Sequence, residues 1–585
     1  MSPFRSTSAA ALGLLCAIAA TTAAQVPGRS PIVPRGTGAA AVSSQGELPV
    51  KYTGKPTTEA ITAGDLMTRL YIFADDSMMG REVGTKYNLM GTAYIEAEVR
   101  RLGLVPAGDN GGYFQNLPVY TYFVDSTSSV TVSGERLMVA TDFLPLVRDE
   151  RRIPLDEVPV VYAGESGDST SWISGDDMAG RIIVLGIPAP GIVPPNSPAL
   201  RARVARAAAV FLVSLDRVRP DQRAGALRTQ SLQREGTPPP ATPNVLITQR
   251  VAALLFGSLD RVKAGAAGKS LSGVIVLRKE QAPGRNVVAI LPGSDAALKG
   301  EYVAIGAHND HIGFNNRPVD HDSIRALNIV ARPQGADSPA PGKLTGEQVA
   351  RIRAMTDSLH GLHGARADSI YNGADDDGTG TVSVLEIAEA FAKSPVRPKR
   401  SILFVWHAGE EKGLWGSMFY TDHPTIPRDS IVAQLNMDMV GRGAAADITG
   451  ESKSGELLHG GPDYLQLVGS RRLSTELGDL METVNTKGKF GFSFDYAMDA
   501  NGHPQNIYCR SDHYEYARYG IPIVFMTTGG HSDYHQVTDE PQYIDYAHMA
   551  DIARFVKDAA TTVANLDHRI VVDKPKPDPK GRCVQ

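Results

Sequence analysis

The chain has 585 residues, of which 42% are hydrophobic and 21% are charged, so it can bury a large core in more than one domain. Its formal net charge of -5 and the lack of long runs of one charge give no basic surface for nucleic acid. These properties argue against a nucleic-acid-binding protein and fit a globular enzyme.

The first 24 residues resemble a signal peptide. Arg5 gives a positive start, Ala9 to Ala20 form a short apolar stretch, and Thr22 to Ala24 are small residues suited to cleavage. The stretch is too short to cross a bilayer, and no later one has the roughly 18 apolar residues that a span requires. We therefore expect an exported protein, periplasmic or extracellular, without a membrane anchor.

Two helices are predicted after a leader. Residues 25–56 are rich in Pro, Gly, Ser and Thr without a period, which indicates a flexible segment. Within residues 57–142, Thr62 and Asp65 resemble a capping box that opens one helix, and a second helix ends at Gly103. This part is expected to begin the main domain.

Residues 143–282 have a different texture, with short strands and many turns. Strands are predicted at 158–162, 182–185 and 210–213, with an Ala-rich helix at 202–209. We interpret this part as a small inserted β-rich domain.

From residue 283 to about 566, strands and helices alternate, which predicts an α/β fold with a mostly parallel sheet covered by helices on both faces. Four nearly continuous apolar runs are the expected central strands: 302–306, 401–406, 431–437 and 521–526.

Histidines and acids lie in or just beyond the ends of these strands or before a helix. They are His308, Asp376, Glu411, Asp438 and His535. Sites in open α/β sheets lie outside the carboxyl ends of the strands, so we expect these side chains to converge. Imidazole nitrogen and carboxylate oxygen are donors that zinc accepts. The pattern therefore predicts a hydrolase with two metal ions.

Two motifs carry a family resemblance. Gly-Ala-Asp-Asp-Asp-Gly-Thr-Gly at 373–380 and Gly-Glu-Glu-Lys-Gly-Leu-Trp-Gly-Ser at 409–417 resemble metallopeptidase family 28, the dizinc aminopeptidase and glutamate carboxypeptidase II family. The resemblance covers 57–142 and 283–565 and implies the zinc-exopeptidase fold. The module at 143–282 resembles a protease-associated (PA) domain inserted into it.

The resemblance also implies a ligand set for two Zn²⁺ ions. Asp376 would bridge both ions, His308 and Asp438 would complete one, and Glu411 and His535 would complete the other. Peptides are the implied substrates, whereas the oligomeric state is left open.

Neighbouring residues receive supporting roles. Glu410 would be the general base, and Asp310 resembles the carboxylate that orients the imidazole two residues before it. Asp377 would follow Asp376 through a cis peptide and support the ligands without binding metal. We interpret His311 as a structural residue or one that contacts a ligand.

The segment 510–514 resembles a loop on the substrate side of the family's site. His513 or Tyr514 could contact substrate there or pack in the core, and the sequence leaves both readings open.

The stretch between His308 and Asp376 is longer than is usual in the family. It contains an insertion at about 314–370, with a helix expected from 346 to 359 behind a cap formed by Thr345 and Gln348. Such a segment can be a lid, a partner surface or a surface elaboration without function.

The favoured function is an exported dizinc aminopeptidase. A glutamate carboxypeptidase would require arginines to hold extra carboxylates, for which Arg442 and Arg510 are the candidates. A glutaminyl cyclase shares much of the site, and a receptor-like binding protein on the same scaffold would be expected to lack ligands that this chain retains.

The end of the chain is Lys- and Pro-rich, and we expect disorder over residues 567–585. After signal cleavage only Cys509 and Cys583 would remain, which is compatible with export but not with a scaffold built on disulfides.

Overall fold

The computed structural model describes residues 48–186, 198–234 and 241–585. Its largest sheet has nine strands in the order β1-β14-β18-β15-β19-β24-β22-β23, with β2 paired to β14. The strands are β1 (Val105–Pro106), β2 (Phe114–Asn116), β14 (Arg285–Leu291), β15 (Tyr302–His308), β18 (Ser401–His407), β19 (Ile431–Met437), β22 (Tyr464–Val468), β23 (Ser493–Asp495) and β24 (Ile523–Thr527).

The four central strands β18, β15, β19 and β24 run parallel, and they are the four apolar runs predicted from the sequence. Toward the edges, β14 and β22 pair antiparallel with their inner neighbours, so the sheet is mixed. The predicted α/β fold is confirmed. Because the central strands are parallel, their carboxyl ends meet at one edge of the sheet.

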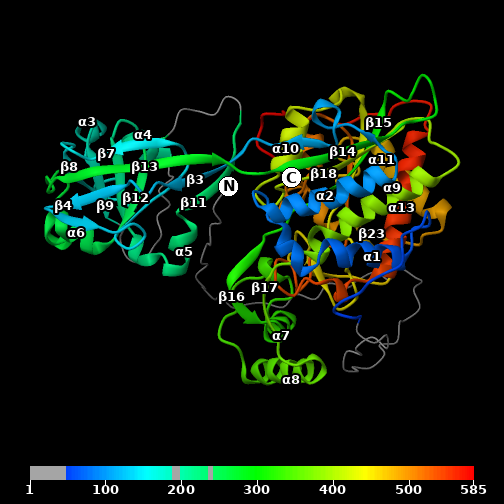
Figure 1. Cartoon of the computed structure of the whole chain (residues 1–585), viewed down its shortest axis with the longest axis horizontal. Helices are drawn as coiled ribbons and strands as arrows, with labels where there is room; N and C mark the ends of the chain where they lie inside the picture. Colours follow the sequence, from blue (N-terminus) through cyan, green and yellow to red (C-terminus); the bar gives the residue numbers. More distant parts are fainter. Residues whose placement is uncertain (1–47, 187–197, 235–240) are drawn as a thin grey trace, which may run out of the picture. The chain divides into compact units, whose positions relative to one another are not determined.

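Helices cover both faces of this sheet. Val303 and Ile305 of β15 lie in one core with α1, α9, α11 and α13, whereas Ala304 between them lies in a second core with α10 and α12. In Figure 1, α9 and α13 lie side by side. The helices are α1 (Ala63–Phe73), α2 (Lys86–Arg101), α9 (Gly380–Lys393), α10 (Trp415–Asp422), α11 (Thr475–Gly488), α12 (His513–Ala517) and α13 (Tyr546–Ala564).

A buried ion-pair cluster ties α1 to α9. Arg69 Nε lies 2.6 Å from Glu386 Oε2, and its Nη2 lies 2.5 Å from Glu389 Oε2, with all three side chains almost fully buried. A buried charge is tolerated only when it is paired, so the cluster holds the two helices in one relative position. The predicted cap of α1 is present, because the Thr62 hydroxyl accepts from Asp65 N at 3.1 Å.

The β-rich part consists of a five-stranded and a six-stranded sheet. It starts at β3, and not at residue 143 as predicted, because β3 and β4 both pair with the distant β13. Its strands are β3 (Val119–Val124), β4 (Ser129–Val132), β5 (Glu135–Leu137), β6 (Phe143–Pro145), β7 (Arg151–Pro154), β8 (Val160–Glu165), β9 (Ile182–Gly186), β10 (Ala209–Val213), β11 (Arg228–Leu232), β12 (Asn244–Ile247) and β13 (Leu271–Gln281). Its helices are α3 (Gly175–Met178), α4 (Pro198–Val204), α5 (Pro220–Gly225) and α6 (Gln249–Phe256). The helix expected at 202–209 therefore lies earlier.

The insertion between His308 and Asp376 forms a two-stranded ribbon and two packed helices (Figure 1). Its elements are β16 (Phe314–Asp320), α7 (His321–Ala331), the short helix η5 (Gly335–Asp337), α8 (Gly346–His363) and β17 (Ala367–Ile370). The predicted capping box of Thr345 and Gln348 is present at the start of α8.

The end of the chain differs from the predicted disorder. Residues 567–585 form neither helix nor strand, but Cys583 is disulfide-bonded to Cys509 and Gln585 is buried. The Gln585 amide oxygen accepts from Tyr508 N at 3.0 Å. Composition could not reveal these contacts, which depend on residues far away in the sequence. Within the described ranges, no helix combines the length and apolar character needed to cross a membrane.

The signal peptide predicted at 1–24 and most of the leader at 25–56 lie outside the described residues.

Candidate metal centre

The fold brings the five predicted ligand residues together. His308 ends β15, Glu411 follows β18, Asp438 follows β19 and His535 follows β24. Asp376 lies in the π-helical turn η6 (Ala374–Thr379) directly before α9. The donor atoms form two groups that share Asp376.

The first group contains His308, Asp376 and Asp438, all buried. His308 Nε2 lies 3.1 Å from Asp376 Oδ1 and 3.5 Å from Asp438 Oδ1. Three donors from three separate segments therefore surround one point.

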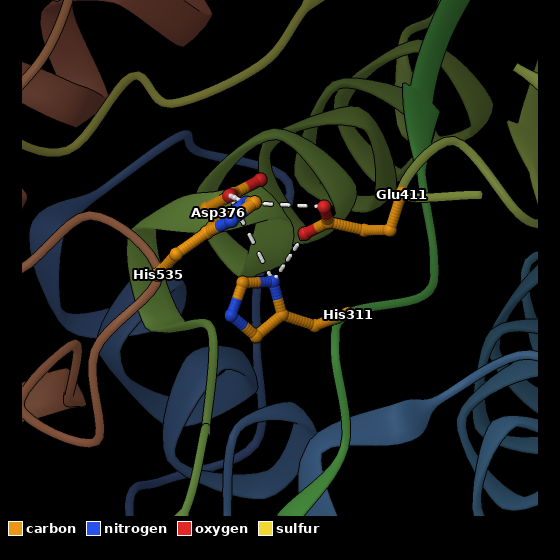
Figure 2. A group of neighbouring side chains, drawn as sticks. All are labelled: His311, Asp376, Glu411 and His535. Atoms are coloured by element: carbon orange, nitrogen blue, oxygen red, sulfur yellow. Dashed lines mark ion pairs between the residues drawn. The ribbon is translucent and has the colours of Figure 1, made fainter. Parts of the chain in front are cut away.

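The second group contains Asp376, Glu411 and His535, together with His311. His535 Nε2 lies 2.9 Å from Asp376 Oδ2 and 3.0 Å from Glu411 Oε2. His311 Nδ1 lies 2.6 Å from Glu411 Oε1 and 3.8 Å from Asp376 Oδ2. Figure 2 shows the four side chains pointing toward one another from different segments. Asp376 thus presents Oδ1 to the first group and Oδ2 to the second.

The donors of both groups fit metal ions. His308 Nε2, Asp438 Oδ1, His311 Nδ1 and Glu411 Oε1 are buried and have no hydrogen-bond partner among the described residues. Buried polar atoms are normally partnered, so four such atoms in one cluster fit the binding of cations. Imidazole nitrogen with carboxylate oxygen is a donor set that suits zinc.

Asp377 holds the ends of three segments together. Its Oδ2 accepts from His308 N at 3.1 Å, and its Oδ1 accepts from Gly380 N at 2.8 Å and Met439 N at 3.2 Å. The peptide bond between Asp376 and Asp377 is cis, as the resemblance implies. Asp377 therefore supports the ligands from behind.

Asp310 supports the site differently from the prediction. Its carboxylate lies 3.8 Å from His308 Nδ1, whereas its backbone oxygen lies 3.1 Å from that nitrogen. The carboxylate instead accepts from the backbone N–H groups of Gly409 at 2.7 Å and Glu410 at 3.1 Å. It thus fixes the turn that carries Glu410 and Glu411, because a backbone carbonyl already orients the imidazole.

A further acidic residue, Asp539, holds the segment around Asp376. Its carboxylate accepts from Asp375 N at 3.0 Å and from Asp376 N at 3.1 Å. Burial raises the pKa of the Asp376 carboxyl, but the neighbouring imidazoles of His308 and His535 outweigh it and lower the pKa well below its usual range. Asp376 is therefore an anion fixed between the two groups of donors.

Glu410 belongs to neither donor group and lines a pocket together with Asp376 and Asp438. Burial raises the pKa of Glu410 well above its usual range, His308 opposes the shift, and the charges of Asp438 and Glu411 add to it. A carboxyl with a raised pKa beside a reaction site is suited to accept and return a proton.

A family model agrees with this site. The model described as Peptidase family M28 matches residues 286–560, which include every donor of both groups. Residues 286–560 belong to peptidase family M28.

Curated proteins are similar to part of the chain. Leucine aminopeptidase 1 of Penicillium rubens is 29% identical over 224 residues, which cover 35% of this chain and 53% of that protein. Leupeptin-inactivating enzyme 1 of Streptomyces exfoliatus is 37% identical over 83 residues, which cover 14% of this chain and 19% of that protein. The chain thus spans about half the length of the first relative and less of the second.

Solved structures are also similar. An aminopeptidase from Aneurinibacillus sp. strain AM-1 has a TM-score of 0.45 and 15% identity, covering 89% of this chain and 98% of that one. BSAP, a zinc aminopeptidase from Bacillus subtilis, has a TM-score of 0.45 and 16% identity, covering 86% and 95%.

The pocket has an apolar part of its wall beside the metal donors. Apolar side chains come from Met439, Met498, Ile507 and Phe525. Gln466 also lines it, but its amide donates to Thr449 O at 3.1 Å and Tyr464 Oη at 2.7 Å. The side-chain amide of Gln466 therefore donates its hydrogen bonds within the wall and not into the pocket. We infer that the pocket suits an uncharged side chain.

His513 and Tyr514 do not line this pocket in the described structure. His513 is fully buried and stacks on Phe525 with ring centroids 4.6 Å apart, and Tyr514 packs against Tyr508. Burial lowers the pKa of His513 to about 3. Of the two readings that the sequence left open for these residues, the structure favours packing in the core, because the start of α12 turns both rings inward.

Two neighbours of these residues reach the M28 site instead. Ser511 Oγ donates to Asp438 Oδ2 at 2.7 Å, and both Arg510 and Ser511 line the pocket. His311, interpreted from the sequence as a structural residue or one that contacts a ligand, contacts Glu411 and lies within the second donor group. Its position three residues after His308 was the available signal, but the irregular segment 309–313 decides where the ring points.

Proposed function

We propose that this chain is an exported aminopeptidase that uses two zinc ions to release N-terminal residues from peptides. The observation that carries the proposal is the pair of complete donor groups sharing Asp376, with Glu410 beside them at the wall of a pocket. The names of the relatives support the choice of an aminopeptidase. The disulfide between Cys509 and Cys583 supports export, since such bonds persist in oxidising compartments, and fractionation of expressing cells tests that part.

His308, Asp438 and Asp376 would hold one ion, and Asp376, Glu411 and His535 the other, with His311 as an additional donor. Zinc bound there would supply Lewis acidity, which polarises the scissile carbonyl and makes water a stronger acid.

Proton transfer and the positioning of the base would be carried out by side chains of the protein. Glu410 accepts a proton from the attacking water as its oxygen bonds to the carbonyl carbon, and it returns this proton to the amine as the C–N bond breaks. Asp310 keeps the Glu410 backbone in place through the N–H groups of the turn. The products are an amino acid and a peptide with a new free amine.

The arginines do not support the carboxypeptidase alternative. Arg442 is buried, donates to Tyr543 O at 2.6 Å and pairs with Asp533, so it supports the fold. Arg510 pairs with Asp337. Arg442 is thus not left to hold a substrate carboxylate, and Arg510 already faces an acid, whereas the acidic groups around Asp376, Glu410 and Asp438 favour a substrate ammonium.

Blocking the substrate's amine should abolish cleavage. We expect release of leucine from a free peptide and none from its N-acetylated form, because the acetyl group removes the ammonium charge. Amidating the C-terminus should change the rate little. Mass spectrometry of the products checks this. Release of C-terminal Glu from blocked peptides would favour the carboxypeptidase, and conversion of N-terminal Gln to pyroglutamate without release would favour the cyclase.

Removing the His311 side chain should weaken the binding of zinc at the second donor group and not at the first. We expect His311→Ala to bind zinc at the second group at least about tenfold more weakly, since even residues that only support ligands change metal affinity 10–100-fold. Dialysis against a weak chelator followed by elemental analysis should leave about two ions in the wild type and about one in the variant. His423→Ala, at an exposed position, is the control. Equal zinc contents would remove His311 from the ligand set.

A further inference from the structure

Asp337 and Arg510 form an ion pair in the wall of the pocket. Arg510 Nη1 donates to Asp337 Oδ2 at 2.9 Å, and its Nη2 lies 3.4 Å from the Tyr534 hydroxyl. Among the described residues that line the pocket, Arg510 is the only Arg, Lys or His. Asp337 ends η5 and therefore belongs to the insertion. The positively charged side chain of Arg510 is thus paired with Asp337, an acid that the insertion supplies.

The insertion is fixed to the segment that carries His535. Ala336 N donates to Tyr534 O at 3.0 Å. Gly335 has φ +53, and a Cβ at this position would lie 2.4 Å from Tyr534 O, so a side chain there would prevent the close approach. Arg325 of α7 donates to Asp533 at 2.7 Å. These contacts hold Asp337 at the pocket.

The pair decides which charges the pocket accepts. A guanidinium without a partner would attract a substrate carboxylate through charge-assisted hydrogen bonds. Asp337 occupies a donor of Arg510 and would repel a second carboxylate. Apart from the acids beside the donor groups, the rest of the wall offers uncharged side chains, apolar ones such as Met439 and Phe525 and polar ones such as Gln505.

We propose that the insertion at 314–370 is a specificity element of the site, in which Asp337 pairs with Arg510 and excludes peptides that begin with an acidic residue. Neutral, apolar N-terminal side chains remain the accepted class. This inference rests on the proposed aminopeptidase function and extends it to the choice of substrate.

Asp337→Asn tests the inference with a change of charge but little change of shape. The measurement is the ratio of kcat/KM for glutamyl p-nitroanilide to that for leucyl p-nitroanilide. We expect this ratio to rise about tenfold, a limited effect because both side chains are partly exposed and therefore screened. In the double variant Asp337→Asn/Arg510→Gln this ratio should not rise, since no positively charged side chain then remains in the wall.

Asp357→Asn is the matched control, because Asp357 is an exposed acid of α8 in the same insertion. It should leave the ratio unchanged. A ratio that stays within about twofold of wild type in Asp337→Asn, while leucyl substrate is still cleaved, would overturn the role of the insertion alone. A wild-type protein that cleaves neither substrate would overturn the proposed function as well.

Discussion

Glu410→Gln is expected to lower turnover on the order of a hundredfold or more while the protein retains its zinc. Glutamine has nearly the same shape as glutamate but cannot accept a proton from water, and the loss of a general base typically costs this much. Glu410 belongs to neither donor group, so metal content should stay at the wild-type value. KM should change little, because the substitution removes an interaction needed in the transition state. Steady-state kinetics and elemental analysis of one preparation check both parts.

Glu411→Gln is the matched comparison, since it makes the same chemical change one residue later. Glu411 contacts His311 and His535 within the second donor group, so this variant should lose zinc as well as activity. Added zinc should restore activity in part to Glu411→Gln and not at all to Glu410→Gln. The opposite pattern would exchange the roles of base and ligand.

The central part of the fold could be predicted because its signals are local. The run at 431–437 is nearly continuous in apolar residues, and it forms β19 with the same bounds. Thr62 and Thr345 cap helices through residues only three positions away. The start of the β-rich part was missed because β3 depends on pairing with β13, which lies far away in the sequence. The contacts of Cys583 are equally non-local.

The positions of the candidate ligands could be predicted for a similar reason. The end of a parallel strand determines where a residue such as His308 or Asp438 lies, whatever the loops do. The role of His311 depends on how the irregular segment 309–313 directs its ring, and the role of Asp310 depends on which of its oxygens reaches His308. The pairing of Asp337 with Arg510 joins two segments that no local pattern connects.

Asp376→Ala is expected to remove zinc from both groups and to abolish detectable activity. Asp376 gives one oxygen to the group with His308 and the other to the group with His535, so its loss leaves each ion with fewer donors. It also leaves the remaining buried carboxylates close together without a cation between them, which disfavours their charged forms. Elemental analysis should therefore show that the variant retains close to no zinc, in contrast to the single ion that His311→Ala is expected to retain.

Wild-type protein treated with a strong chelator is the appropriate comparison for this variant. Both should be folded and inactive, and circular dichroism should distinguish them from an unfolded chain. Added zinc should restore the chelated wild type, because its donors are intact, and should fail to restore Asp376→Ala. A variant that retained two zinc ions would show that the binding of neither ion depends on Asp376. A variant that retained one ion and most of the activity would show that a single ion is sufficient for the reaction, and the pair of groups would then need another explanation.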